Sequence, residues 1–210
     1  MSVCALGHPL MEDEYLETVA RHTSGEKGSR GCDLIARMFA EVVNILTRTD
    51  DDILGDLYQG GISRGEHGQF LTPMAICRMQ AQMLLPQEPT GIEGRRSVSD
   101  PCCGSGRMLM AAAEVQPDWH FVGQDVDLRC VRLTAINLAL RNRYGHVVWG
   151  NTLKNTTRMV YETGRLQVYG NVIRKVALAT TPPEVQRVEL QVPQPDSFEE
   201  RPKSQLNLFD

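Results

Sequence analysis

The sequence predicts an α/β fold, in which helices wind a sheet of parallel strands. Two observations predict it: three short β-prone runs alternate with two helix-prone runs between residues 97 and 149, and the first run leads directly into a glycine turn. Strands joined through helices pair in parallel by right-handed crossovers, so their carboxyl ends should meet at one edge of the sheet. A chain of 210 residues is long enough for one such domain with a buried core and short extensions.

The N-terminal part of the chain is predicted to be helical. Residues 1–32 show no clear period, but from Asp33, the expected N-cap, apolar residues recur at helical spacing. Shorter helices should follow over Asp52–Tyr58 and Met74–Leu85. We therefore expect residues 1–65 to form a helical N-terminal extension.

The α/β domain itself is predicted over residues 66–192. Its expected elements are, in order, a strand over 97–100, a helix over 107–114, a strand over 119–123, a helix over 127–142 and a strand over 146–149. Two more runs have the composition of strands, Leu166–Tyr169 and Val172–Ala179, and Pro182-Pro183 ends the second. After Pro193 the chain becomes polar and proline-bearing, so residues 193–210 are expected to form a disordered tail.

The turn after the first predicted strand has the sequence D-P-C-C-G-S-G, from Asp100 to Gly106. Strand, glycine turn and helix in this order let the backbone approach a nucleotide-like ligand, because glycine takes positive φ and has no side chain to block the ligand. The spacing is not G-x-G-x-x-G and no Lys-Ser/Thr pair follows, which argues against a dinucleotide site and a P-loop. A purely structural strand-to-helix turn is the alternative.

Three further segments flank this turn: G-Q-F-L-T-P at Gly68–Pro73, G-Q-D-V-D at Gly123–Asp127 and G-N-T-L at Gly150–Leu153. With the glycine turn, and in this order, they resemble the S-adenosylmethionine (SAM)-binding half of adenine-N6 DNA methyltransferases, and most closely the modification subunit of type I restriction systems. The resemblance covers roughly residues 33–153, and four motifs in the family's order are far more specific than any one of them. It implies a class I SAM-dependent methyltransferase-like (Rossmann-like) sheet with a helical N-terminal extension.

The resemblance also implies a SAM site at the carboxyl ends of the predicted strands. In such a site the methionine end lies against the glycine turn, the ribose hydroxyls bond to Asp125, the adenine edge meets Asn151, and the segment around Phe70 folds over the methionine end. Two alternatives remain open, namely Asp125 as the N-cap of the next helix and the segment before Pro73 as an ordinary loop. The implied cofactor-binding residues are Phe70, Thr72, Pro73, Asp100, Cys102, Cys103, Gly104, Gly106, Asp125, Val126, Asn151 and Leu153.

The sequence departs from the family at the catalytic motif. Adenine-N6 methyltransferases use an Asn/Asp-Pro-Pro-aromatic turn, whose polar side chain and proline carbonyl bind the target amine while the aromatic ring stacks on the flipped base. The nearest match here is Thr181-Pro182-Pro183-Glu184, in which a hydroxyl replaces the amide and a carboxylate replaces the ring. Three interpretations stay open: a divergent DNA methyltransferase, a SAM-binding regulatory or interaction module without catalysis, and a subunit that needs a partner chain such as another restriction-modification subunit.

Charge is distributed unevenly along the chain, whose net charge is −4. Acids outnumber bases in residues 1–60, whereas bases outnumber acids in residues 151–192. We therefore expect DNA phosphates to face the second half of the chain, with a solvated helix face as the alternative. The helix after Asp127 adds Arg129, Arg132, Arg141 and Arg143 to this half.

The C-terminal residues carry an independent motif, Q-L-N-L-F at Gln205–Phe209. It resembles the Q-L-x-L-F peptide by which bacterial proteins dock on the DNA sliding clamp. In that mode Gln205 supplies an anchoring hydrogen bond, and an apolar pocket takes Leu206, Leu208 and Phe209. The alternative is that these apolar residues pack on the chain's own domain.

The remaining sequence features argue against several classes of site and location. None of the six cysteines belongs to a C-x-x-C pair or has a histidine at metal-ligand spacing, so no metal site is expected and the thiols should be reduced and mostly buried. No apolar run approaches the length of a membrane span, and the N-terminus has no basic-then-apolar signal segment. We expect a cytoplasmic protein with no membrane partner.

Overall fold

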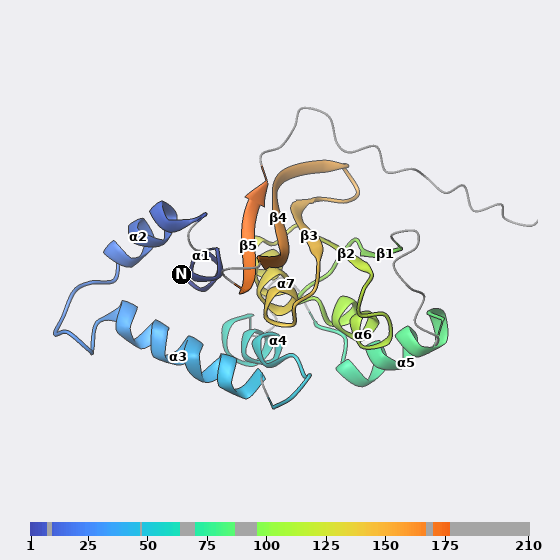
Figure 1. Ribbon diagram of the computed structural model, residues 1–210, viewed down its shortest axis with the longest axis horizontal. Coiled ribbons are helices and arrows are strands. Elements are labelled where there is room, and N and C mark those ends of the chain that lie inside the picture. The colour runs from blue at the N-terminus through green and yellow to red at the C-terminus, as the bar shows by residue number, and fades with distance from the viewer. Residues whose placement is uncertain (8–9, 47, 64–69, 87–95, 167–169, 177–210) are drawn as a thin grey trace, which may run out of the picture. The chain divides into compact units, whose positions relative to one another are not determined.

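The computed structural model of this chain describes residues 1–7, 10–46, 48–63, 70–86, 96–166 and 170–176. Helices precede the sheet in the chain and alternate with its first strands (Figure 1). The predicted order of strands and helices in the central unit is confirmed, with boundaries that differ by a few residues. The elements are α1 (Ser2–Leu6), α2 (Glu12–Ala20), α3 (Gly31–Leu46), α4 (Ile53–Leu57), a π-helix (Tyr58–Ser63), α5 (Met74–Leu84), β1 (Ser97–Asp100), α6 (Arg107–Val115), β2 (His120–Asp125), α7 (Leu128–Leu140), β3 (Gly145–Asn151), β4 (Thr156–Leu166) and β5 (Gly170–Val176).

The five strands form one mixed sheet in the order β1-β2-β3-β4-β5. β1, β2 and β3 are parallel, whereas β4 is antiparallel to β3 and β5 is antiparallel to β4. The predicted α/β fold, with a methyltransferase-like sheet and helices ahead of it, is confirmed. The carboxyl ends of the three parallel strands meet at one edge of the sheet, which is where ligands bind in folds of this kind.

The long strand β4 corrects the prediction for the residues that follow β3. The sequence predicted strands at Leu166–Tyr169 and Val172–Ala179. β4 ends where the first of these was expected to begin, whereas β5 confirms the second over residues 172–176. The pairing of β3 with β4 contains a β-bulge in which Arg158 has no partner residue, so the alternation of inward and outward side chains changes phase within the strand. β5 pairs with β4 and lies at the edge of the sheet opposite β1.

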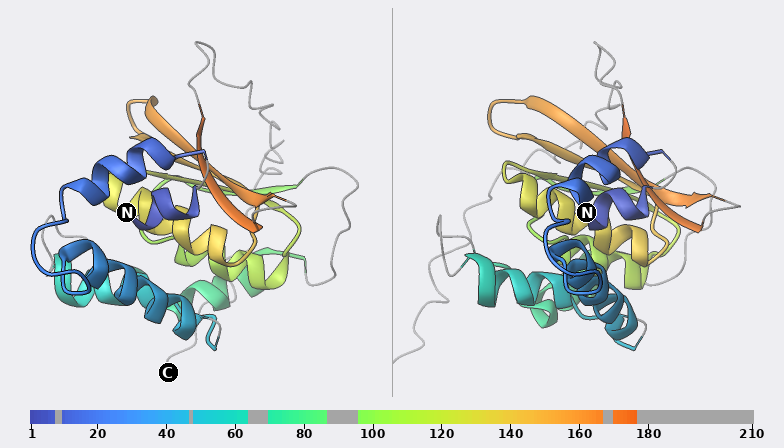
Figure 2. Two further views of the ribbon diagram at one scale, coloured as in Figure 1. Left: turned by 60° about the vertical axis from the view of Figure 1, so that its left-hand side comes forward. Right: turned by 90° about the vertical axis from the view of Figure 1, so that its left-hand side faces the viewer.

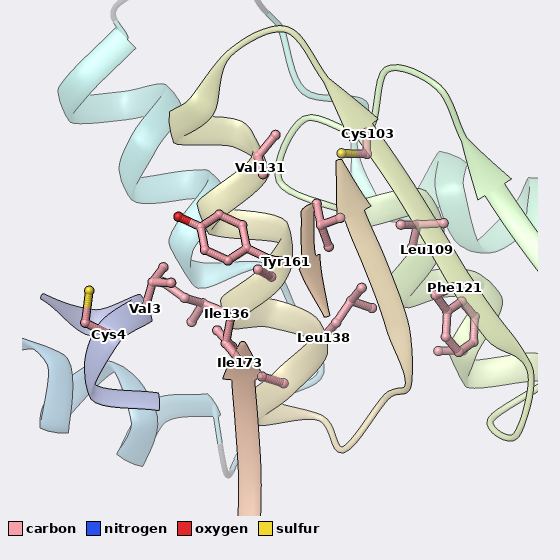
Figure 3. Packing of buried hydrophobic residues seen from close by; sticks show 14 of the residues in the cluster. Val3, Cys4, Cys103, Leu109, Phe121, Val131, Ile136, Leu138, Tyr161 and Ile173 are labelled. Atoms are coloured by element: carbon pink, nitrogen blue, oxygen red, sulfur yellow. The ribbon is translucent and has the colours of Figure 1, made fainter. Parts of the chain in front are cut away.

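One face of the sheet is covered by α6 and α7 (Figure 2). α7 contacts β2, β3, β4 and β5, while α6 contacts β1 and β2. Phe121, Tyr161 and Ile173 from the sheet and Leu138 from α7 are fully buried in the core between them (Figure 3). Because α7 starts directly after β2, its first turn lies at the carboxyl edge of the sheet.

The N-terminal helices contribute to the same core. α1 packs on α7 and β5, and it buries Val3 and Cys4. No period was evident in this part of the sequence because α1 is little more than one turn long and α2 buries no residue. α3 begins at Gly31, so Asp33 lies within it and is not its N-cap. The Asp33 carboxylate instead accepts hydrogen bonds from the backbone N–H groups of Gly28 (2.8 Å) and Arg30 (3.2 Å).

Several predicted features lie outside the described residues. They are the strand end beyond Val176, the catalytic candidate Thr181-Pro182-Pro183 and the whole tail with Gln205–Phe209. Across the described ranges, no helix combines the length and the hydropathy that a membrane span requires.

Candidate functional site

A pocket of about 530 Å³ opens at the carboxyl ends of β1, β2 and β3. The glycine turn, the residues that follow β2 and β3, and the segment before α5 form its wall. A volume of several hundred cubic ångströms is typical of a site for a small molecule or cofactor. The predicted site residues that line the pocket are Phe70, Thr72, Asp100, Cys102, Cys103, Gly104, Asp125, Val126, Asn151 and Leu153.

Two predicted site residues, Gly106 and Pro73, do not line the pocket but begin the helices behind its wall. Pro73 is the N-cap of α5 and Gly106 is the N-cap of α6. Gly106 has a φ of 91°, and a Cβ added there would lie 3.0 Å from Thr134 Cγ2. Gly104 also has a positive φ, of 55°, as the sequence predicted. Both positions therefore favour glycine, and the turn presents its backbone to the pocket.

Asp125 ends β2 and faces the glycine turn across the pocket floor. Its two carboxylate oxygens accept backbone hydrogen bonds from Gly104 (2.9 Å) and Asp127 (2.8 Å). The alternative in which Asp125 caps α7 does not hold, because Asp127 is the N-cap and accepts a hydrogen bond from the Arg129 N–H (2.8 Å). Each oxygen of Asp125 retains a second lone pair, so the carboxylate can still accept hydrogen bonds from a ligand.

A second carboxylate, Asp100, lies on the neighbouring strand and lines the same pocket. It accepts a hydrogen bond from the backbone N–H of Cys102 (3.0 Å). Burial raises the pKa of Asp100 and of Asp125 above the ordinary aspartate value, and for Asp100 the charge of Asp125 acts in the same direction. Two partly desolvated carboxylates favour a ligand that brings positive charge into the pocket, since it would offset this cost.

The β3 side of the pocket combines polar groups with exposed apolar side chains. Thr152 donates a hydrogen bond from its hydroxyl to the Pro101 carbonyl (2.7 Å), which ties the end of β3 to the glycine turn. The Asn151 side chain accepts a hydrogen bond from the Lys154 N–H (2.9 Å). Leu153 is 98% exposed at the pocket's rim, so its apolar surface is free to cover a ligand.

Behind the glycine turn, Asp52 at the start of α4 is fully buried. Its carboxylate accepts hydrogen bonds from the Gly55 N–H (2.8 Å), Arg107 Nε (2.8 Å) and Asn137 Nδ2 (2.8 Å), and from the hydroxyl of Ser105. Asn137 also donates to the Ser105 carbonyl (2.9 Å). Asp52 therefore connects α4 to the glycine turn, α6 and α7 through one network, which we call the Asp52 network.

Arg107 extends this network to the segment in front of α5. Besides Asp52, its guanidinium donates to Asp56 of α4 (2.5 Å) and to the Thr72 carbonyl (3.3 Å). Arg107 also lines the pocket. The planar guanidinium, with its five donors, thereby connects α6 to α4 and to the segment before α5.

Sequence reasoning did not identify the Asp52 network. The only local signal was a polar residue, Asn137, within the apolar run of a predicted helix. A buried polar side chain needs partners, so such a residue indicates an internal hydrogen-bond network even when its partners cannot be named.

The four arginines in and after α7, which were expected to contribute to a phosphate-facing surface, all bond to groups of the chain itself. Arg132 Nε donates to the Tyr161 hydroxyl (3.5 Å). Arg129 pairs with Asp127 (2.8 Å). Arg141 donates to backbone carbonyls that precede α4, and Arg143 donates to a carbonyl that precedes β2. These cations therefore serve the chain's own structure more than an external phosphate.

Three cysteines, Cys102, Cys103 and Cys130, line the pocket. Five cysteines are buried, and Cys102 is exposed at the pocket. Burial raises the pKa of Cys130, which also lines the pocket, to about 12. Within the described ranges, no three His, Cys, Asp or Glu side chains are grouped as metal ligands.

A mixed sheet with a cofactor-sized pocket at the carboxyl ends of its parallel strands is a Rossmann-like arrangement. The sequence model of the N-6 DNA methylase family matches residues 49–172, which is more than half of the chain. The chain belongs to this family, and the matched region contains both the Asp52 network and the glycine turn. No curated protein and no solved structure shows significant similarity to the chain.

Proposed function

We propose that this chain binds SAM in the pocket at the carboxyl edge and transfers a methyl group to the N6 atom of adenine in DNA. The observation that carries the proposal is the position of Asp125, which is held against the glycine turn by the Gly104 N–H and faces the pocket. The family to which the chain belongs methylates DNA and generally uses SAM. The pocket's size, its polar floor and its two carboxylates suit that cofactor.

In this proposal each wall of the pocket holds one part of SAM. Asp125 accepts hydrogen bonds from the ribose hydroxyls, and the backbone of the glycine turn faces the methionine end. Val126 and Leu153, both exposed at the rim, cover the adenine, whose edge bonds to Asn151. The carboxylates of Asp100 and Asp125 favour the positive charges of SAM. SAM itself supplies an electrophilic methyl group on a cationic sulfur.

The catalytic role in this proposal falls to Thr181 and the prolines that follow it. The Thr181 hydroxyl and a carbonyl of Pro182-Pro183 accept hydrogen bonds from the target amine and so orient its lone pair. A threonine has one hydroxyl where the family has a planar amide, so a slower reaction than that of typical members is expected. The alternatives are a SAM-binding module without catalysis and a subunit whose partner chain completes the catalytic site.

The proposal is tested by transfer of a labelled methyl group from SAM to unmethylated genomic DNA by the purified chain. We expect label in N6-methyladenine, and we expect Thr181→Ala to abolish its incorporation because the variant removes the side-chain acceptor that stands where the family has its Asn or Asp. Thr180→Ala, the adjacent threonine, is the matched control and should retain activity. Absence of incorporation in a sample shown to bind SAM would contradict the enzymatic part of the proposal and favour the two alternatives.

We also propose, from the sequence, that the tail at Gln205–Phe209 binds the bacterial DNA sliding clamp. Removal of residues 205–210 should abolish binding of the purified chain to purified clamp, because the apolar side chains that fill the clamp's pocket would be lost. The point variant Phe209→Ala should act like the deletion, and Asn207→Ala should bind normally. Equal binding by the full and shortened chains, measured by surface plasmon resonance, would dismiss this proposal.

A further inference from the structure

The β3–β4 hairpin forms part of the rim of the pocket. Its turn, Thr152–Asn155, follows directly after the strand end that carries Asn151, and Thr152 and Leu153 line the pocket. Every residue from Thr152 to Arg158 is exposed. A macromolecule whose reactive group enters the pocket would therefore pass close to this hairpin.

The turn end of the hairpin carries two cations and no acid to compensate them. Residues 152–158 include Lys154 and Arg158 and contain no acid. Among the described residues neither cation has an acidic partner, whereas Arg78, Arg107, Arg129, Arg174 and Lys175 all form ion pairs. The hairpin thus presents two uncompensated positive charges beside the pocket, although the net charge of the chain is −4.

Arg158 is held in place by the β-bulge. Trp149 lies opposite Met159 and Gly150 lies opposite Thr157, so Arg158 is the extra residue of β4. A bulge of this kind redirects a side chain and is often found next to functional sites. Here the guanidinium carbon of Arg158 lies 5.0 Å from the centre of the Trp149 ring.

The Trp149 ring is itself fixed, because its indole N–H donates to the Val126 carbonyl (3.0 Å). Val126 lines the pocket, so this bond connects the Trp149 ring, over which the Arg158 guanidinium lies, to the pocket wall. Stacking on an aromatic face orients a guanidinium while its N–H edges stay available, which is a suitable arrangement for binding a phosphate. Lys154, in the turn, adds a second cation that can reach a neighbouring phosphate.

We propose that the β3–β4 hairpin binds the phosphate backbone of DNA through Lys154 and Arg158, and so holds the substrate at the mouth of the pocket. This inference rests on the proposed function, because it states where the DNA to be methylated lies. Contacts of this type supply affinity and position without reading sequence. Each phosphate contact also releases counterions from DNA, which makes the contribution of the hairpin measurable as a salt dependence.

The test measures binding of the full chain to a labelled DNA duplex of roughly 30 base pairs. The measurement is fluorescence anisotropy at several salt concentrations. The double variant Lys154→Ala/Arg158→Ala should bind at least about tenfold more weakly at low salt. The slope of the logarithm of the binding constant against the logarithm of the salt concentration is negative, and its magnitude should decrease by about two. The matched control is Arg21→Ala/Lys27→Ala, which removes the same charge from exposed positions in and after α2. This control should retain the wild-type affinity and slope.

A third variant, Arg158→Lys, separates charge from geometry. It keeps the cation but loses the planar fork, so we expect affinity between those of the wild type and the double variant. Wild-type affinity and slope in the double variant, or no binding of duplex by the intact chain, would overturn the inference. SAM binding, measured in the same samples, should be unchanged by the double variant. Hairpin-dependent DNA binding in a chain that does not bind SAM would refute the proposed function and leave the hairpin's role intact.

Discussion

Replacing Asp52 by alanine should destabilise the protein by about 3–5 kcal/mol, which is the usual cost of removing one partner from a buried ion pair. The Asp52 side chain is 0% exposed and that of Arg107 is 8% exposed. Without the carboxylate, the Arg107 guanidinium would stay buried beside an empty space. Asn137 Nδ2 and the Ser105 hydroxyl would also lose an acceptor. Unsatisfied buried donors of this kind add to the cost of the lost charge.

The measurement is urea unfolding of the wild type, Asp52→Ala and Asp56→Ala. Asp56 binds the same arginine but its side chain is 67% exposed, so its replacement should cost no more than about 1 kcal/mol. Loss of Asp52 should also weaken cofactor binding, because the network holds the glycine turn. The apparent affinity also falls in proportion to the fraction of the variant that remains folded. Equal stability of the two variants would contradict our assignment of Asp52 as the centre of this network.

Local signals explain which parts of the site could be predicted. The glycine turn and the strand ends at Asp100, Asp125 and Asn151 are each marked by a few consecutive residues. The α/β class then places these segments at one edge of the sheet, because parallel strands end together. The location of the pocket can therefore be predicted from these short motifs together with the rule that ligands bind at the carboxyl ends of parallel strands.

The Asp52 network could not be predicted in this way. Asp52 is separated in sequence by 53 residues from Ser105, by 55 from Arg107 and by 85 from Asn137. An acid at the start of a short helix indicates an N-cap, and Asp52 does cap α4 through the Gly55 N–H. Its second role depends on how α4 packs against α6 and α7, which no local pattern encodes.

β4 was missed for a different reason. Its buried side chains, Tyr161 and Thr163, keep the two-residue period of a strand. The bulge at Arg158 breaks that period in the first half of the strand, where the residues are polar and exposed. The bulge that interrupts the two-residue period also places Arg158 over the Trp149 ring. The position where the sequence pattern fails is therefore also the position of a candidate DNA-binding residue.

Asp125→Ala should weaken SAM binding at least tenfold. Hydrogen bonds to a charged group contribute roughly 1.5–3 kcal/mol, and the variant removes the acceptor that we assign to the ribose. Isothermal titration with SAM measures the change. Asp127→Ala is the matched control, since Asp127 is two residues away, pairs with Arg129 and does not line the pocket. Full-strength SAM binding by Asp125→Ala would refute the assigned site.

The pH dependence of SAM binding provides a second test of the same carboxylate. Burial raises the pKa of Asp125, so the charged form that accepts the ribose hydrogen bonds is lost at a pH above the ordinary aspartate value of about 3.9. SAM affinity should therefore fall as the pH drops through this raised pKa. Protonation of Asp125 would not cause the same loss of SAM binding by unfolding the protein. A carboxyl group whose pKa is higher in the folded state binds protons more tightly there, so its protonation stabilises the fold as the pH falls.

Asp125→Asn should bind SAM weakly at neutral pH and lose most of this pH dependence. Asp100, whose pKa burial also raises, should account for the dependence that remains. The same pH profile in the wild type and in Asp125→Asn would place the titrating group elsewhere.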